Sequence, residues 1–185
     1  MSDASLDEIL KRISDSTDWF SAGPVSAVTL ALSASLAVAV ASTLRDEENP
    51  DAVEAQAEVL RDRALELVER NRRDLERARL ALAPGAGKDD RLLLEALEQT
   101  LENLQDLAGC AADVATILVE ITGKVDASSE PDLVSAVVLA EAVAVNALKL
   151  AEANLLHMPE RPVTEAIRLD RKIAASARER LLGES

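Results

Sequence analysis

A few carboxylates and amides interrupt the apolar stretches of this sequence, and they are the residues best placed to do chemistry. Asp132 follows Pro131 at the start of a long apolar run, and Glu141 lies further along the same run between alanines and valines. A carboxylate among apolar neighbours is paired, turned toward solvent, or functional, because an unpaired buried charge is costly. Asn71 and Asn154 are amides in comparable surroundings. Such a set can support carboxylate-assisted hydrolysis or ring opening, in which the carboxylate moves protons and steadies positive charge.

Other kinds of site have little support in the sequence. The sole histidine, His157, stands beside Pro159 at a predicted helix end, where a surface position is favoured over a general base. One histidine and one cysteine, Cys110, cannot build a zinc site, and residues 83–88 lack the glycine spacing of a phosphate-binding loop. We therefore expect no metal and no resident cofactor. A single cysteine also fits a reducing, cytoplasmic location.

Two nearly uncharged helices are predicted to position the polar residues. Residues 24–44 carry no charge and begin with proline, which suits the first turn of a helix. A helix that is apolar all round is either buried in a core or crosses a membrane. Its length matches a span, but its content of alanine, serine and threonine and its acidic flanks favour a buried core helix. A second helix of this kind is expected over residues 132–156.

Amphipathic segments surround these two helices, at about residues 5–14, 50–83, 90–120 and 163–182. With 48% hydrophobic but only 1% aromatic residues, leucine, valine and alanine must fill the core. The prediction is one all-α domain over residues 1–185, an antiparallel bundle of about six helices with the two apolar helices at its centre.

The charge balance and the small residues restrict the partners. The net charge of −14 repels phosphate backbones and anionic lipids, so we expect neither a nucleic-acid nor a membrane partner. The helix over residues 24–44 carries a row of alanine, serine and threonine that lets another helix approach closely. We therefore expect a homodimer that acts on a small molecule.

Three segments carry a resemblance to a known family, and the resemblance covers nearly the whole chain. Residues 21–28, Ser-Ala-Gly-Pro-Val-Ser-Ala-Val, resemble a Gly-Gly-Gly-Ser-Val-Ala-Ala-Leu segment that begins a central helix. Residues 131–142 resemble a Ser-Asp-x-x-Val-Ala-x-Leu-x-Ala motif, and residues 150–155 resemble an Asn-Val-x-Ile-Asn-Leu ending. The family is that of the cyclodeaminases and methenyltetrahydrofolate cyclohydrolases. In this chain Gly23 alone remains of the three glycines, and Asn71 stands where family members have an aspartate.

The resemblance implies an enzyme that opens or closes a cyclic amidine, with a methenyl- or formimino-tetrahydrofolate as substrate. Asp132 is then the predicted catalytic carboxylate, although a plain helix cap explains the same residue. The pocket is expected at the Gly23 end of the central helix, facing Asp132. The predicted substrate-binding residues are Trp19, Phe20, Ser21, Gly23, Asn71, Glu141 and Asn154.

Two alternatives remain open at this point. One keeps the fold and the pocket but changes the substrate to a non-folate cyclic imine or amide in a specialised pathway. The other is a non-catalytic helical dimer or binding module. Binding of a folate, or of any small molecule between the two apolar helices, would separate these hypotheses.

Overall fold

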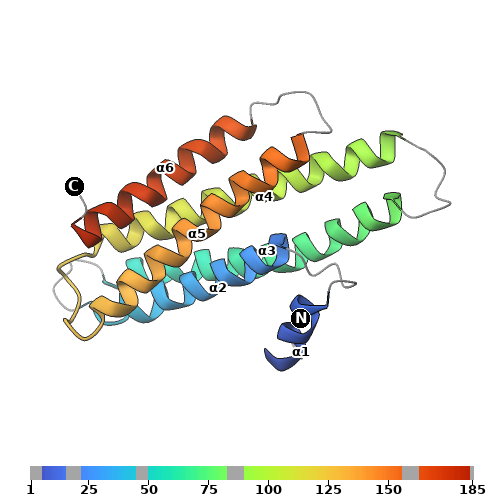
Figure 1. Cartoon of the computed structure of the whole chain (residues 1–185). Coiled ribbons are helices and arrows are strands. Elements are labelled where there is room, and N and C mark those ends of the chain that lie inside the picture. The colour runs from blue at the N-terminus through green and yellow to red at the C-terminus, as the bar shows by residue number, and fades with distance from the viewer. Residues whose placement is uncertain (1–5, 16–21, 45–49, 83–89, 156–162, 184–185) are drawn as a thin grey trace.

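The protein is all α-helical, as the sequence predicts. The computed structural model describes residues 6–15, 22–44, 50–82, 90–155 and 163–183, and these ranges contain helices and turns but no strand. The helices are α1 (Leu6–Ser14), α2 (Ala22–Ala41), α3 (Pro50–Leu82), α4 (Asp90–Glu120), α5 (Glu130–Leu155) and α6 (Val163–Leu182) (Figure 1).

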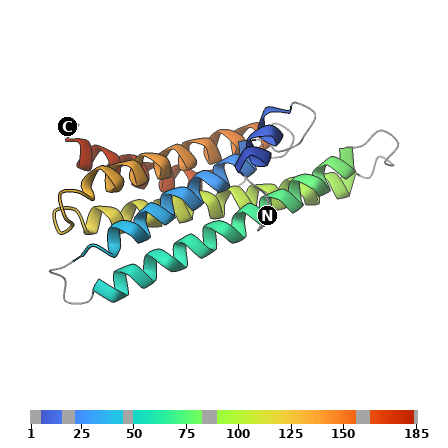
Figure 2. The same cartoon turned by 90° about the horizontal axis from the view of Figure 1, so that it is seen from below.

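Helices α2 to α6 run side by side as an elongated bundle, whereas α1 stands off to one side (Figures 1 and 2). Around the bundle, α3 packs on α2, α2 on α5, α5 on α6, α6 on α4 and α4 on α3. Helix α4 also touches both apolar helices, because it packs on α5 and reaches across to α2. The centre of the bundle is therefore shared by the two predicted apolar helices and by α4.

Small side chains let α2 lie close to its neighbours. Ala27, Ala34 and Ala37 are buried, and so is Ser33, whose hydroxyl donates to the backbone carbonyl of Ala136 on α5 at 2.7 Å. A hydroxyl can reach the backbone of a facing helix only where the two helices approach closely. This contact fixes the register between α2 and α5.

By length and composition alone, α2 and α5 would each suffice to cross a membrane. In the bundle, 56% of the most apolar window of α2 and 44% of that of α5 are buried against other helices. These faces already have protein neighbours, which supports the interpretation of both helices as core helices.

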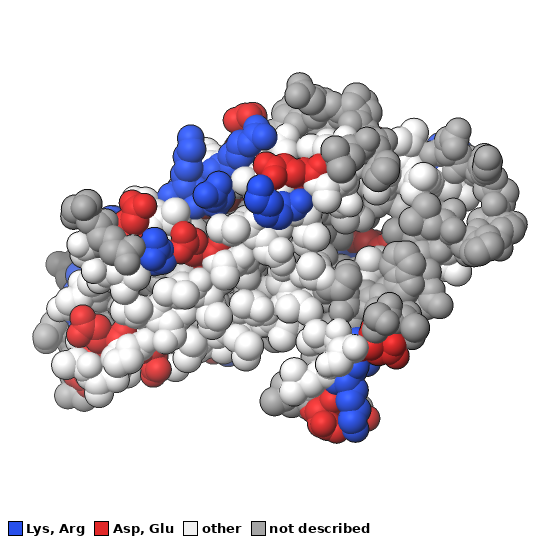
Figure 3. Space-filling model, in the orientation of Figure 1, with Lys and Arg blue, Asp and Glu red and all other residues white. Residues whose placement is uncertain are grey.

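The outward faces of α2 and α5 form a surface that is almost free of charge. Leu32 is 57% exposed on α2, beside exposed Ser35 and Ala39, and Val138 is 40% exposed on α5 near exposed Ala142. In Figure 3 this surface is the white area below the charged side chains of α6. We call it the uncharged face.

Candidate functional site

The register of α2 against α5 decides which residues can meet. Asn146 donates its amide to the Ala22 carbonyl at 3.4 Å and to the Ser26 hydroxyl at 2.5 Å. Ser33, further along α2, contacts Ala136, which comes earlier on α5. The two helices are therefore antiparallel, and the end of α5 lies beside the start of α2.

This arrangement contradicts the predicted pairing of Gly23 with Asp132. Asp132 is exposed near the start of α5, fourteen positions before Asn146, which corresponds to about 21 Å along a helix at 1.5 Å per residue. Gly23 lies at the other end, where α2 begins. The prediction failed because both residues open helices, and antiparallel neighbours place their starting ends apart.

A different group of residues lies beside Gly23. There the beginning of α2, the second half of α3, the first half of α4 and the end of α5 surround a cavity of about 120 Å³. Its described lining consists of Gly23, Pro24, Asn71, Asp74, Leu75, Thr100, Asn103, Leu104, Leu150 and Asn154. We call it the amide cavity. It brings together three of the predicted site residues, Gly23, Asn71 and Asn154.

The polar centre of the amide cavity is a buried pair, Asp74 on α3 and Asn103 on α4. Asp74 is 5% exposed and Asn103 is 0% exposed. The Asn103 amide nitrogen donates to one carboxylate oxygen of Asp74, and the Arg77 guanidinium lies 3.3 Å from the other. An ionised carboxylate only accepts hydrogen bonds, so the amide nitrogen must face it. Asn103 Oδ1 is thereby turned elsewhere, buried and without a hydrogen-bond partner among the described residues.

The second amide, Asn71, is held by its own helix. Its Nδ2 donates to the Leu67 carbonyl at 3.0 Å, one turn back along α3. Its Oδ1 lies 3.3 Å from the position that a Cβ on residue 23 would occupy. Glycine at that position therefore leaves the Asn71 oxygen room at the cavity wall.

The described lining is rich in hydrogen-bond acceptors. It holds the Asp74 carboxylate, the Asn103 and Asn71 amides, whose nitrogens donate to Asp74 and to the Leu67 carbonyl, and Thr100, whose hydroxyl proton is given to the Ala96 carbonyl at 2.9 Å. Asn154 adds an amide that can donate as well as accept. No lysine or arginine is among the described lining residues. The cavity is therefore suited to a group that donates N–H or O–H hydrogen bonds.

Other predicted site residues lie elsewhere. Glu141 forms an ion pair with Arg178 of α6, with 2.8 Å between Oε2 and Nε, and both side chains are partly buried. It precedes Asn154 by thirteen positions, about 20 Å along α5, so the structure does not bring it to the amide cavity. Trp19, Phe20 and Ser21 fall outside the described residues.

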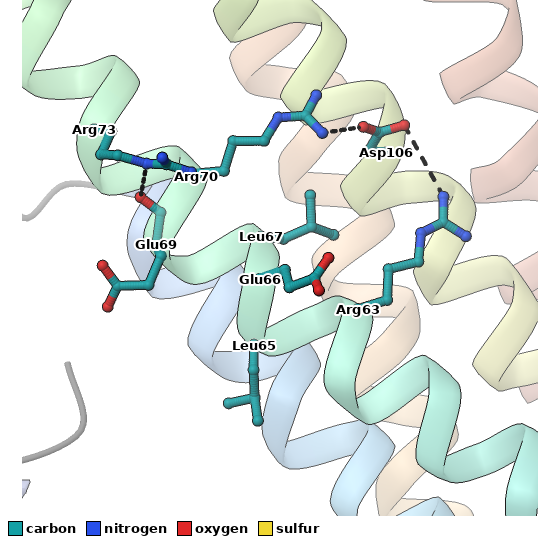
Figure 4. A pocket seen from close by; sticks show the side chains of 8 residues that line it. All are labelled: Arg63, Leu65, Glu66, Leu67, Glu69, Arg70, Arg73 and Asp106. Atoms are coloured by element: carbon teal, nitrogen blue, oxygen red, sulfur yellow. Dashed lines mark hydrogen bonds and ion pairs between the residues drawn. The ribbon is translucent and has the colours of Figure 1, made fainter.

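A larger hollow of about 540 Å³ lies on the surface along α3 (Figure 4). Arg70 and Arg63 approach the Asp106 carboxylate of α4 at 2.7 and 4.0 Å, and Arg73 donates to the Glu69 carbonyl at 3.4 Å. Carboxylates therefore lie close to the arginines that line this hollow, and the positive and negative charges largely offset one another. The part of the chain that the structure describes also has no group of three or more His, Cys, Asp or Glu side chains placed to share a metal ion.

The sequence analysis missed Asp74 and Asn103 as site residues. Asp74 is preceded by two arginines and looks like part of a solvated charged face, while Asn103 stands between Glu102 and Leu104. One signal was present: Asp74 follows Asn71 by three positions and Leu67 by seven, on the inward stripe of the helix. The pairing of α3 with α4 that joins the two residues is a tertiary contact.

Comparison with known proteins bears on the fold. No family model matches the sequence, and no curated protein matches it. Among solved structures, the crystal structure of formiminotetrahydrofolate cyclodeaminase from Thermotoga maritima matches with a TM-score of 0.79. The match covers 98% of this chain and 93% of the other at 17% sequence identity. The chain thus has the fold that its sequence motifs predicted, while its substrate and chemistry must be argued from the site.

Proposed function

We propose that this protein is an enzyme of the cyclodeaminase or cyclohydrolase type whose reaction takes place at the amide cavity. The observation that carries the proposal is the buried Asp74 carboxylate, which lines a cavity beside an amide oxygen that has no partner among the described residues. Buried carboxylates in cavities are frequent sites of acid–base chemistry. The fold shared with a cyclodeaminase adds support by analogy.

The proposed reaction opens or closes a cyclic amidine, and a methenyl- or formimino-tetrahydrofolate is the substrate to test first. In the hydrolytic direction, water adds to the amidine carbon, one C–N bond breaks, and the released nitrogen gains a proton. In the cyclodeaminase direction, a second amine nitrogen of the substrate attacks the formimino carbon, the new C–N bond closes the ring, and the formimino nitrogen takes up a proton and leaves as ammonia. Each reaction needs a group that takes a proton at one step and returns it at another.

Asp74 is the only carboxylate among the described lining residues, so we assign it that role. Its negative charge also favours the cationic amidinium. Asn103 positions the carboxylate through its hydrogen bond. Asp132, the carboxylate predicted from the sequence, is exposed and remains the alternative to be tested against Asp74.

A non-folate cyclic imine or amide is the second candidate substrate. The cavity of about 120 Å³ is small, whereas sites for drug-sized ligands usually measure about 300–1,000 Å³. It therefore has room for the reacting ring, and that ring need not belong to a folate.

We further propose that the protein is soluble and cytoplasmic, needs no metal or resident cofactor, and forms a homodimer through the uncharged face. Two copies of a chain with a net charge of −14 repel each other over most of their surface. The uncharged face is almost free of charged side chains, so two copies can approach there with less repulsion. A non-catalytic dimer or binding module is the competing hypothesis, and it predicts no turnover of any cyclic amidine.

A thermal-shift screen tests the proposed ligand class. A ligand at 100 times its dissociation constant stabilises the folded state by about 2.7 kcal/mol, which for a domain of this length raises Tm by about 5–11 °C. We expect this shift with methenyl- or formimino-tetrahydrofolate and a much smaller one in the Asp74→Asn variant. An equal shift in both proteins would place the ligand elsewhere, and no shift with either folate would remove the folates as substrates.

A further inference from the structure

We propose that a hollow between the C-terminal parts of α4 and α6 binds a small molecule that carries one carboxylate on an apolar body. The hollow measures about 360 Å³, within the usual range of about 300–1,000 Å³ for ligand sites. The two helices supply its described lining: Thr116, Val119 and Glu120 from α4, and Lys172, Ile173, Ser176, Ala177 and Arg180 from α6. We call it the α4–α6 hollow.

This hollow is separate from the amide cavity. Helix α4 contributes to both, with Thr100 at the amide cavity and Thr116 at the α4–α6 hollow. Sixteen positions separate the two threonines, which corresponds to about 24 Å along a helix at 1.5 Å per residue. The α4–α6 hollow is therefore a second site, and the proposal does not depend on the reaction proposed for the amide cavity.

A row of polar side chains with free donors lines one side of the hollow. Lys172, Ser176 and Arg180 are spaced four positions apart on α6, so they are neighbours on one face of the helix. None of the three makes a side-chain hydrogen bond or an ion pair among the described residues. Across the hollow, by contrast, the Thr116 hydroxyl donates to the Ala112 carbonyl at 2.8 Å. An ammonium, a hydroxyl and a guanidinium are thus available together to bind the oxygens of an anion.

The positive charge of α6 is available only in part. Lysine and arginine outnumber aspartate and glutamate on this helix, although the whole chain has a net charge of −14 (Figure 3). Arg168 lies 2.6 Å from a Glu165 oxygen, and Arg178 lies 2.8 Å from a Glu141 oxygen, so these two arginines have carboxylate partners. The two cations that line the hollow have none among the described residues, and they can attract an anionic ligand to an otherwise acidic protein.

The rest of the lining has room for an apolar body. Ile173 is 39% exposed, while Ala177 is buried and Val119 is half-buried. A cavity of about 150 Å³ can hold a benzene molecule, so the space of about 360 Å³ here suits a ring, a short chain and a carboxylate. Covering the apolar side chains adds a gain that a simple inorganic anion cannot provide.

Glu120 limits the charge of the ligand. It is the only carboxylate among the described lining residues, and it forms no ion pair among the residues that the structure describes. A ligand with two negative charges, such as a phosphate monoester, is repelled by Glu120, and a cationic ligand is repelled by Lys172 and Arg180. The charges of the lining therefore match a single carboxylate best.

Probes that share one apolar body test the ligand class by NMR titration or calorimetry at millimolar concentration. Phenylbutyrate carries the carboxylate, phenylbutanol is neutral, phenylbutylamine is a cation, and acetate lacks the apolar body. We expect phenylbutyrate to bind at least fivefold more tightly than each of the other three and more tightly than phenyl phosphate. Any of these four binding as tightly as phenylbutyrate would overturn the proposal.

Variants on α6 locate the binding. Lys172→Gln and Arg180→Gln should each weaken phenylbutyrate binding at least threefold, and the double variant should weaken it at least tenfold. Arg171→Gln is the matched control, because Arg171 is exposed on the same helix but does not line the hollow. It should leave binding unchanged, and circular dichroism checks that each variant is folded. Unchanged binding in the double variant, or an equal loss in Arg171→Gln, would overturn the proposal.

Discussion

Replacing Asp74 and Asn103 together by leucine should make the protein more stable, although it removes the proposed site. The pair is almost fully buried, and the Asn103 oxygen has no partner among the described residues. Function commonly retains such groups at a cost in stability, whereas a pair kept for stability should be fully satisfied.

The structure gives the size of the effect. Leaving a buried polar group unsatisfied costs about 1–3 kcal/mol, and a hydrogen bond to a charged group contributes about 1.5–3 kcal/mol. Asn103→Leu loses the bond to Asp74 but also removes the unpaired oxygen, so these effects largely offset each other. Asp74→Leu leaves the whole Asn103 amide unpaired and should cost about 1–3 kcal/mol.

The double variant removes every member of the pair. Replacing buried charged groups by apolar residues is often neutral or stabilising, by up to about 4 kcal/mol. The adjacent cavity of about 120 Å³ can take up the larger leucine side chains. We expect a gain of about 2 kcal/mol, which corresponds to about 4–8 °C in Tm.

Urea unfolding followed by circular dichroism measures this as a higher midpoint with an unchanged slope. Ser33→Ala serves as the matched control, because Ser33 is equally buried but its hydroxyl is satisfied by the Ala136 carbonyl. That control should lose about 1 kcal/mol. A double variant less stable than the wild type would mean that Asp74 and Asn103 are structural, and it would refute the reasoning.

Three further predictions concern other parts of the molecule. Burial raises the pKa of the Cys110 thiol to about 11, so at pH 8 Cys110 should resist a thiol reagent until urea unfolds the chain; rapid labelling of the native protein would contradict its burial. Burial, and then the nearby Asp113 carboxylate, raise the pKa of Asp170 above its ordinary 3.8. The folded state therefore loses stability as pH rises through that raised pKa, and Asp170→Asn should raise Tm at pH 7 but not at pH 3, where both states are protonated. Leu32→Glu on the uncharged face should convert the proposed dimer to a monomer in light scattering, whereas Val59→Glu, at a residue 65% exposed on α3, should not; a wild-type monomer at micromolar concentration would refute the dimer.

The helices were predictable because their signals are local. Pro24 and Pro50 suit first turns, and the uncharged stretch gave α2 within three residues of its observed bounds, Ala22–Ala41. The apolar run after Pro131 predicted the second apolar helix over residues 132–156 in the same way, and the observed α5 is Glu130–Leu155. First-turn prolines and uninterrupted apolar runs are local features of the sequence, so they can be recognised without knowledge of the neighbouring helices.

The site was only partly predictable, because it depends on register and packing. Gly23, Asn71 and Asn154 do line one cavity. Asp132 does not, since the antiparallel order of α2 and α5 places it at the far end, and no local pattern states that order. The Asp74–Asn103 contact joins residues 29 positions apart on different helices, and it follows only from how α3 packs on α4.

Steady-state turnover of methenyltetrahydrofolate by the wild type, Asp74→Asn and Asp132→Asn tests the central claim most directly. If Asp74 is the acid–base group, Asp74→Asn should lower turnover by about 10²–10⁴-fold with the fold intact, while Asp132→Asn should remain within about twofold of the wild type because asparagine caps a helix as well as aspartate. Loss of activity in Asp132→Asn, together with wild-type activity in Asp74→Asn, would contradict the assignment of the amide cavity as the active site.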